Sequence, residues 1–248
     1  LIEEEECIIT LTHNGYTKRM PVDTYRSQHR GGRGITGVTT REEDFVEHIF
    51  TASTHDNILF FTTKGMVYRL KGYQVPESSR TAKGMAIVNI LPLDSDEKIS
   101  AMIPVREFNN GDYLTFVTRE GLVKRTDIMD YSRIRQNGLR AIDLVDGDEL
   151  ISVNKTDGEQ EIMVATKDGF AVRFKETDAR AMGRTTRGVK AVELRKGDCV
   201  VSAMVIDENK SVLAITEGGY GKRTDVEEYR LQSRGGKGIF TYKLTEKT

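Results

Sequence analysis

The chain has 248 residues, with 37 Lys and Arg against 38 Asp and Glu, four His, two Cys and no Trp. A chain of this length buries about 70–75% of its unfolded surface, so its core needs neither disulfides nor a metal. No apolar run approaches the roughly 20 residues that cross a bilayer, and two isolated cysteines make no disulfide framework. A membrane-spanning, collagen-like or disulfide-stapled protein is therefore excluded.

The first six residues are acidic and belong to no repeat, so we expect residues 1–6 to be the end of a linker and residues 7–248 to form one domain. Within that domain the pattern Thr-x-x-Gly-x-x-x-Arg recurs five times, with its Gly positions 50, 56, 48 and 50 residues apart. Such self-similarity indicates a repeat architecture. The expected repeats are approximately 7–56, 57–110, 111–158, 159–208 and 209–248.

A second Gly follows each Arg of this pattern, 15 residues later in four repeats and 13 residues later in the third. Lys or Arg precedes it in four repeats, whereas the third has Asn137. We call the first Gly of each repeat the hairpin glycine and the second the loop glycine. The hairpin glycines are Gly15, Gly65, Gly121, Gly169 and Gly219, and the loop glycines are Gly34, Gly84, Gly138, Gly188 and Gly238.

Each repeat is predicted to contain about four short strands, because its β-branched and aromatic runs end at glycine turns and no long 3.6-residue period is present. This is typical of a propeller-like ring, in which each sheet buries its faces against its neighbours. The expected strands include 58–63, 66–70, 86–91, 98–103, 113–118, 189–194, 200–205 and 212–216.

Charge is strongly segregated within the repeats. The stretches from each hairpin glycine to four residues past the loop glycine carry 25 Lys and Arg but nine Asp and Glu, a net +16, while the rest of the chain carries −17. Equivalent positions of a repeat ring lie at equivalent places on every blade. We therefore expect a basic belt, which favours a polyanionic partner over a merely solvated face.

Duplex DNA bent around the belt fits this pattern best, with affinity that falls steeply as salt increases. No recognition helix is predicted, so sequence preference is expected to come from how easily the DNA bends. Two alternatives remain open: a propeller that docks an acidic protein, and a propeller enzyme with a central polar pocket. The Arg of each repeat has a structural alternative too, an ion pair with an acid on the adjacent blade.

Two loops, 28–34 and 232–238, both read Gln-x-Arg-Gly-Gly-[Arg/Lys]-Gly. This sequence resembles the signature box of the C-terminal domain of the bacterial DNA gyrase A subunit, and the repeats resemble that domain over nearly the whole chain. The resemblance implies an all-β fold, a β-pinwheel with five visible four-stranded blades, possibly truncated from six, whose blades exchange strands. The related topoisomerase IV domain, which usually lacks an intact box, is the nearest alternative.

By the same resemblance, the domain wraps duplex DNA and supports ATP-dependent negative supercoiling by the gyrase holoenzyme. The implied partners are DNA, the gyrase A N-terminal region and the gyrase B subunit, in a heterotetramer; the isolated domain is expected to be monomeric. The chain itself is expected to hold no cofactor or metal and to perform no catalysis, because the cleavage tyrosine and the ATP and Mg sites lie elsewhere in the enzyme. A cytoplasmic, nucleoid-associated bacterial protein is expected.

The resemblance assigns the first box to wrapping and treats the fifth-repeat loop as a second box, whose glycines permit a tight or left-handed turn. The third repeat departs from the pattern, since its cations are out of register. The residues predicted to bind DNA are Lys18, Arg19, Arg26, Gln28, Arg30, Gly31, Gly32, Arg33, Gly34, Arg69, Lys71, Arg80, Lys83, Lys124, Arg125, Arg133, Arg135, Arg140, Arg173, Lys175, Arg184, Arg187, Lys222, Arg223, Arg230, Gln232, Arg234, Gly235, Gly236, Lys237 and Gly238.

Overall fold

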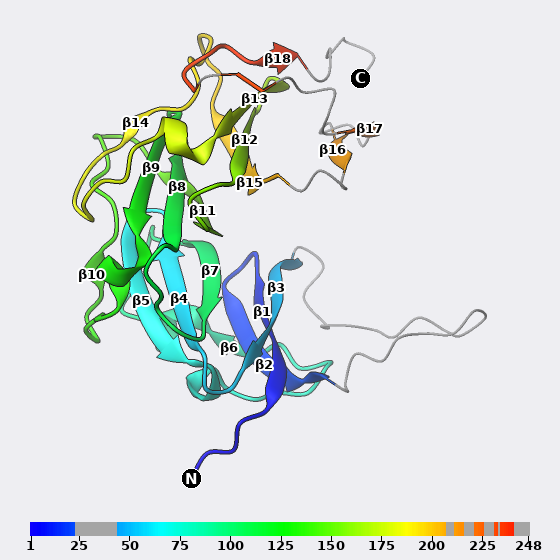
Figure 1. Cartoon of the computed structure of the whole chain (residues 1–248). Coiled ribbons are helices and arrows are strands. Elements are labelled where there is room, and N and C mark those ends of the chain that lie inside the picture. Colours follow the sequence, from blue (N-terminus) through cyan, green and yellow to red (C-terminus); the bar gives the residue numbers. More distant parts are fainter. Residues whose placement is uncertain (23–43, 207–210, 216–220, 226–230, 233, 241–248) are drawn as a thin grey trace. The chain divides into compact units, whose positions relative to one another are not determined.

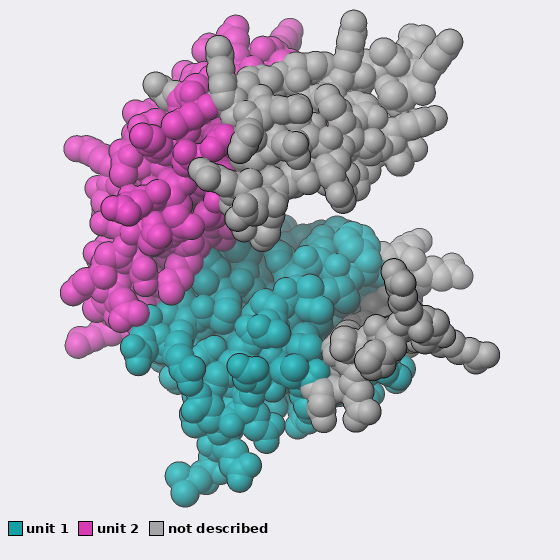
Figure 2. Space-filling model, turned by 45° about the vertical axis from the view of Figure 1, so that its right-hand side comes forward, with its two compact units in different colours: residues 1–61, 67–107, 134–139 teal, residues 62–66, 108–133, 140–248 magenta. Residues whose placement is uncertain are grey.

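The computed structural model describes residues 1–22, 44–206, 211–215, 221–225, 231–232 and 234–240. Every regular element of these residues is a short strand or a single 3₁₀ turn, so the all-β prediction is confirmed. No helix in this part of the chain is long and apolar enough to span a membrane. The residues fall into two compact units, 1–61 with 67–107 and 134–139, and 62–66 with 108–133 and 140–248, which Figure 2 colours separately.

Four antiparallel sheets of four strands and one pair of strands make up the described fold (Figure 1). Their orders are β3-β1-β2-β6, β10-β5-β4-β7, β11-β8-β9-β14 and β15-β12-β13-β18, with β16 paired to β17. The three long strands of the first sheet are β1 (Glu6–Thr12), β2 (Tyr16–Pro21) and β3 (Val46–Ser53); those of the second are β4 (Asn57–Thr62), β5 (Met66–Lys71) and β7 (Ile99–Val105).

The third and fourth sheets repeat this plan. Their long strands are β8 (Tyr113–Thr118), β9 (Leu122–Asp127), β11 (Leu150–Thr156), β12 (Glu161–Thr166), β13 (Phe170–Lys175) and β15 (Val200–Val205). The last pair is β16 (Ser211–Ile215) and β17 (Gly221–Asp225). The 3₁₀ turns are η2 (Gly72–Gln74), η3 (Ile87–Asn89), η4 (Ile128–Tyr131) and η5 (Glu176–Asp178).

The fourth strand of each complete sheet comes from the following repeat. These strands have two residues each: β6 (Met85–Ala86), β10 (Leu139–Arg140), β14 (Val189–Lys190) and β18 (Ile239–Phe240). In Figure 1, β14 lies beside β9, although it belongs to the repeat of β12 and β13. The implied strand exchange is therefore present.

The strands predicted over 86–91 and 189–194 are wrong in length. Only the first two residues after the loop glycine pair with the neighbouring sheet, and the apolar residues that follow 86 form η3. Ile87, Leu91 and Val192 are nevertheless buried, because this segment covers the core of the preceding sheet. Burial, rather than strand pairing, explains its apolar composition.

The Thr-x-x-Gly part of the repeat is a hairpin motif. In the first four repeats the glycine N–H donates to the carbonyl of the Thr, and the Thr hydroxyl accepts from the residue four positions later, at 3.1–3.2 Å. The glycines have φ between +83° and +93°, a region that a residue with a Cβ rarely adopts. Thr and Gly are therefore fixed by the turn itself.

A core of aliphatic and aromatic side chains lies between the third and fourth sheets. Val117 and Val123 of the third sheet pack with Ile162, Val164 and Phe174 of the fourth, each at most 1% exposed. Two half-buried sheets thus share one apolar layer, as expected for blades that bury their faces against each other. This packing fixes the positions from which the basic loops leave the sheets.

Candidate nucleic-acid interface

The Arg of the repeat motif forms structural contacts in three of the described repeats. Arg125 is buried, donates to the carbonyl of Ala179 at 2.9 Å and lies 3.6 Å from the carboxylate of Glu176. Arg19 donates to the carbonyl of Val75 at 3.0 Å. In both cases the guanidinium holds a segment of the following repeat.

Arg173 instead pairs within its own sheet, at 2.6 Å from the carboxylate of Glu161. Arg69 is exposed, and of Arg223 the structure describes the backbone alone. The adjacent-blade ion pair considered as an alternative is therefore realised by Arg125 with Glu176, and at a longer 3.9 Å by Arg19 with Glu77. The Arg125 side chain is 9% exposed and that of Arg19 is 15% exposed.

Two predicted DNA contacts, Lys18 and Lys124, are buried at 1% and 0% exposure. The Lys18 Nζ donates to three carbonyls, those of Ser79, Arg80 and Ala82, at 2.7–2.9 Å. No phosphate can reach an ammonium group that is enclosed in this way. Lys18, Lys124 and Arg125 therefore act inside the fold, which corrects their prediction as surface cations.

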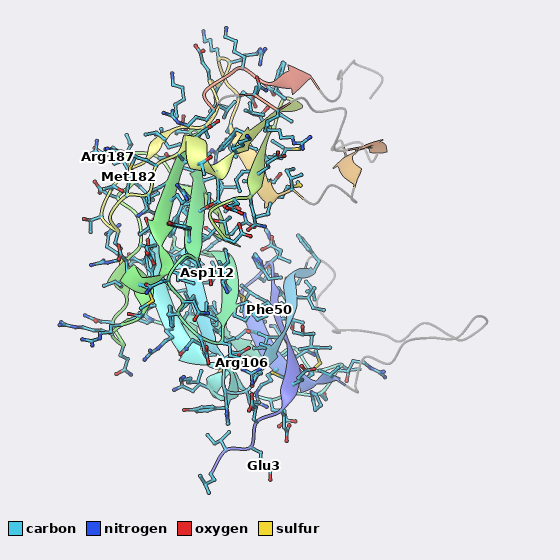
Figure 3. All side chains as sticks on the ribbon, viewed as in Figure 1. Glu3, Phe50, Arg106, Asp112, Met182 and Arg187 are labelled. Atoms are coloured by element: carbon cyan, nitrogen blue, oxygen red, sulfur yellow. The ribbon has the colours of Figure 1, made fainter. Side chains whose placement is uncertain are left out.

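The loops before the loop glycines expose cations. Arg187 is 62% exposed and stands on the loop that leads to β14, where Figure 3 labels it together with Met182. Lys237 is also exposed, while Arg184, Arg80 and Lys83 are half-buried. These residues precede the loop glycines of the second, fourth and fifth repeats.

Guanidinium groups connect successive basic loops in the second unit. Arg184 Nη1 donates to the carbonyl of Arg140 at 2.6 Å, and Arg140 Nη1 donates to the carbonyl of Lys64 at 3.0 Å. One repeat further, Arg234 Nη1 donates to the carbonyl of Lys190 at 3.0 Å. Lys190 and Arg140 both follow a loop glycine by two residues, so the same contact recurs and brings cations of three repeats side by side.

One exposed acid interrupts this row of cations. Asp143 lies 3.3 Å from the Nε of Arg187, and both side chains are at least half exposed. An exposed pair of this kind contributes at most about 1 kcal/mol, so the carboxylate competes only weakly with another anion for the guanidinium.

The fifth-repeat box has the backbone geometry that its glycines imply. Gly235 and Gly238 have φ of +85° and +87°, and a Cβ at Gly238 would lie 2.8 Å from the carbonyl oxygen of Ala171. The Gly235 N–H donates to the carbonyl of Ala191 at 2.6 Å. Glycine is therefore required both by conformation and by the close approach of the preceding sheet.

The remaining predicted residues divide into two groups. Arg133, Arg135, Arg140 and Lys175 are exposed, and Lys71 and Gln232 are half-buried. The first box, Gln28 to Gly34, together with Arg26 and Arg230, lies outside the described residues, and of Lys222 the structure describes the backbone alone.

Sequence reasoning missed a recurring buried acid. One carboxylate oxygen each of Asp44, Asp148 and Asp198 accepts the backbone N–H of the residue before a hairpin glycine, at 2.9–3.0 Å. These acids lie 27–29 residues after the glycine in the sequence, and that recurrent spacing is the signal that could have found them. Part of the acidic charge outside the basic stretches is thus structural.

A hollow of about 760 Å³ in the first unit bears on the enzyme alternative. It is lined by residues 88–92 and by Arg135, Gln136 and Asn137, so that its polar side chains are one guanidinium and three amides. This lining supplies no acid–base pair for general catalysis. Among the described residues, moreover, no three His, Cys, Asp or Glu side chains form a group that could hold a metal.

A family model described as the DNA gyrase C-terminal domain, beta-propeller, matches the chain over residues 8–53, 56–106, 112–157, 160–207 and 210–247. The DNA gyrase A subunit of Halalkalibacterium halodurans is 55% identical over 185 residues, or 75% of this chain and 22% of that protein. That of Clostridium acetobutylicum is 54% identical over 184 residues, again 22% of its length. The chain thus spans about one fifth of these curated relatives.

Two solved structures have the same architecture. A C-terminal domain of DNA topoisomerase IV matches with a TM-score of 0.80 at 30% identity, covering 97% of this chain and 73% of that one. A DNA gyrase A C-terminal domain matches with a TM-score of 0.75 at 26% identity, covering 95% and 76%. With the strand-exchanged sheets and the five matched repeats, these likenesses confirm the resemblance: the chain belongs to the family of DNA gyrase C-terminal domains and has their β-pinwheel fold.

Proposed function

We propose that this chain binds duplex DNA non-specifically along its basic loops, bends it, and thereby supports negative supercoiling by a gyrase holoenzyme. The observation that carries the proposal is the row of loops in the second unit, where Arg184 donates to the carbonyl of Arg140 and, one repeat further, Arg234 donates to that of Lys190. Lys and Arg aligned in this way displace condensed counterions from a phosphate backbone.

The interface that we propose consists of exposed or half-buried cations of the basic loops and of the strands beside them. It comprises Arg69, Lys71, Arg80, Lys83, Arg133, Arg135, Arg140, Lys175, Arg184, Arg187, Arg234 and Lys237, with the two Gly-rich boxes at residues 28–34 and 232–238. Repetition over several repeats matters because bending a 20–30 bp duplex by 40–90° costs about 1–6 kcal/mol, which a single loop cannot offset.

The whole-protein context is part of the same proposal. The chain serves as one non-catalytic domain of a bacterial cytoplasmic topoisomerase, and the expected linker end at residues 1–6 is corrected, because Glu6 pairs with Ser53 in the first sheet. It works with a gyrase A N-terminal region and a gyrase B subunit, which hold the cleavage, metal and ATP sites. The relatives that are DNA gyrase A subunits support this assignment over topoisomerase IV, whose C-terminal domain has the same fold.

The decisive experiment seals a nicked plasmid with a ligase in the presence of the chain, which fixes the linking number. The linking number is then measured after the protein is removed. Wrapping with a fixed hand shifts the linking number in one direction in proportion to bound protein. A linking number that stays unchanged while the DNA is saturated refutes wrapping.

A variant series locates the interface. Log K for DNA binding falls as log salt rises, and replacing Arg187 and Lys237 with Ala should make this slope less steep, by about 0.9 for each lost phosphate contact. The matched control is Arg106→Ala, which removes an exposed cation outside the basic stretches (Figure 3) and should leave the slope unchanged. Equal effects of the two changes would contradict the proposed interface.

A further inference from the structure

One interior position recurs in the first four hairpins, three residues after the hairpin glycine. It is occupied by Lys18, Tyr68, Lys124 and Val172, and none of the four is more than 5% exposed. Tyr and Val suit such a place, whereas a lysine must leave water and is tolerated only where its amine is fully hydrogen-bonded. Two buried lysines at this position therefore require a structural explanation.

Each amine donates to at least one carbonyl of the basic loop of the next repeat. Lys18 receives all three of its carbonyls from residues 79–82, immediately before Lys83 and its loop glycine. Lys124 donates to the carbonyl of Arg184, to that of Ala141 at 2.6 Å and to the hydroxyl of Tyr131 at 3.5 Å. Each amine thus has three partners, which matches its three donors.

The two loops held in this way have the same sequence pattern. Residues 80–84 read Arg-Thr-Ala-Lys-Gly and residues 184–188 read Arg-Thr-Thr-Arg-Gly. Turning their carbonyls towards one buried amine fixes the backbone from which both cations of the loop extend. The loop after Val172 is of the other type, Arg-Gly-Gly-Lys-Gly at 234–238.

That second loop type has a different support. The guanidinium of Arg234 itself donates to the carbonyls of Asp178 and Lys190, both at 3.0 Å. A buried amine is therefore paired with the Arg-Thr-x-cation-Gly loops, and a valine with the Gly-Gly loop. The correlation ties the identity of an interior residue to the type of loop that covers it.

We propose that Lys18 and Lys124 are positioning residues for DNA binding, each holding the basic loop of the following repeat in its binding shape without touching DNA. This rests on the proposed function and extends it to two side chains that solvent does not reach. The loops 79–84 and 183–188 are the elements on which the two lysines act.

The test replaces Lys124 with Met in the full chain, which keeps the length of the side chain and removes its three donors. Backbone amides of residues 183–188 should exchange hydrogen faster, and the salt slope of DNA binding should fall by about one to two units, as one or both loop contacts are lost. The control is Val117→Ala, because Val117 is 1% exposed in the same sheet and its side chain has no donor for the loop carbonyls. It should reduce the stability of the fold and leave the salt slope unchanged.

A double-variant cycle separates positioning from plain stabilisation. If Lys124 acts through the loop cations, adding Lys124→Met to a variant that already lacks the side chains of Arg184 and Arg187 should lower the salt slope no further. Additive losses, or an unchanged slope in Lys124→Met alone, overturn the proposal. If Lys124→Met does not fold, the same two measurements are made on Lys18→Met. Hydrogen exchange is then followed at residues 79–84, and Ile9→Val is the control variant.

The same experiments distinguish failure of the inference from failure of the proposed function. If the unaltered chain shows no DNA affinity that depends on salt and on duplex length, the DNA-binding function itself is refuted. If the unaltered chain binds DNA and Lys124→Met binds with the same slope and loop protection, only the positioning role is refuted.

Discussion

The loop glycines provide the sharpest test of how the repeats are joined. A Cβ added at Gly188 would lie 2.4 Å from the carbonyl oxygen of Val123, a distance that real Cβ atoms do not reach, and φ there is +95°. Gly197 has φ of +80° but nothing within 4 Å of the added atom. The two Gly→Ala variants therefore share the backbone strain and differ in the steric clash.

The left-handed conformation costs an alanine about 1–2 kcal/mol, and reduced freedom of the unfolded chain returns about 0.4–1 kcal/mol, so Gly197→Ala should lose about 1 kcal/mol. Gly188→Ala must also move β14 away from β9, where Val189 pairs with Val123 and Lys190 with Leu122. If two hydrogen bonds between β14 and β9 are lost, Gly188→Ala should lower the free energy of unfolding by about 2 kcal/mol more than Gly197→Ala.

The assay is thermal unfolding followed by circular dichroism on the two variants and the unaltered chain. A difference of about 2 kcal/mol corresponds to a Tm about 4–8 °C lower for Gly188→Ala than for Gly197→Ala. Equal melting temperatures would refute the argument that the close approach of the neighbouring sheet, rather than φ alone, requires glycine at this position.

Three further predictions concern charge. Glu176→Gln should destabilise the fold by about 3 kcal/mol in urea unfolding, because it leaves the buried Arg125 without its counter-charge; a loss below 1 kcal/mol would contradict this. Asp143→Asn should strengthen DNA binding about two- to fivefold in a fluorescence titration by freeing the exposed Arg187, and weaker binding would count against the interface. Burial lowers the pKa of Lys124 to about 7 from the 10.5 of an exposed lysine. The unfolded chain then binds the additional proton, so stability should rise between about pH 7 and 10, and Lys124→Met should flatten that rise.

The local pattern of the sequence predicts most strand positions well. The strand expected over 113–118 is β8 at the same residues, and those expected over 58–63 and 200–205 lie within one residue of β4 and β15. These segments combine β-branched residues with a glycine turn, which leaves little choice of conformation. Residues 86–91 mislead because an apolar run that covers a core by a 3₁₀ turn has the same composition as a strand.

The candidate site is predictable only in part, because charge in a sequence carries no information on burial. Lys18 and Arg187 both lie in basic stretches, yet one is enclosed by carbonyls and the other is exposed. The distinction depends on strand alternation within the hairpin and on a loop some 60 residues away. Only the tertiary fold brings these two segments together.

Strand exchange has a consequence for how such a chain can lose or gain a module. Deleting the sequence repeat between the hairpin threonines Thr166 and Thr216 removes β14 from the third sheet together with β13 and β15 of the fourth. The sequence repeat and the four-stranded sheet thus have different boundaries along the chain, because each sheet takes its fourth strand from the following repeat. After such a deletion the third sheet is complete only if the next two-residue strand, β18, takes the place of β14 beside β9.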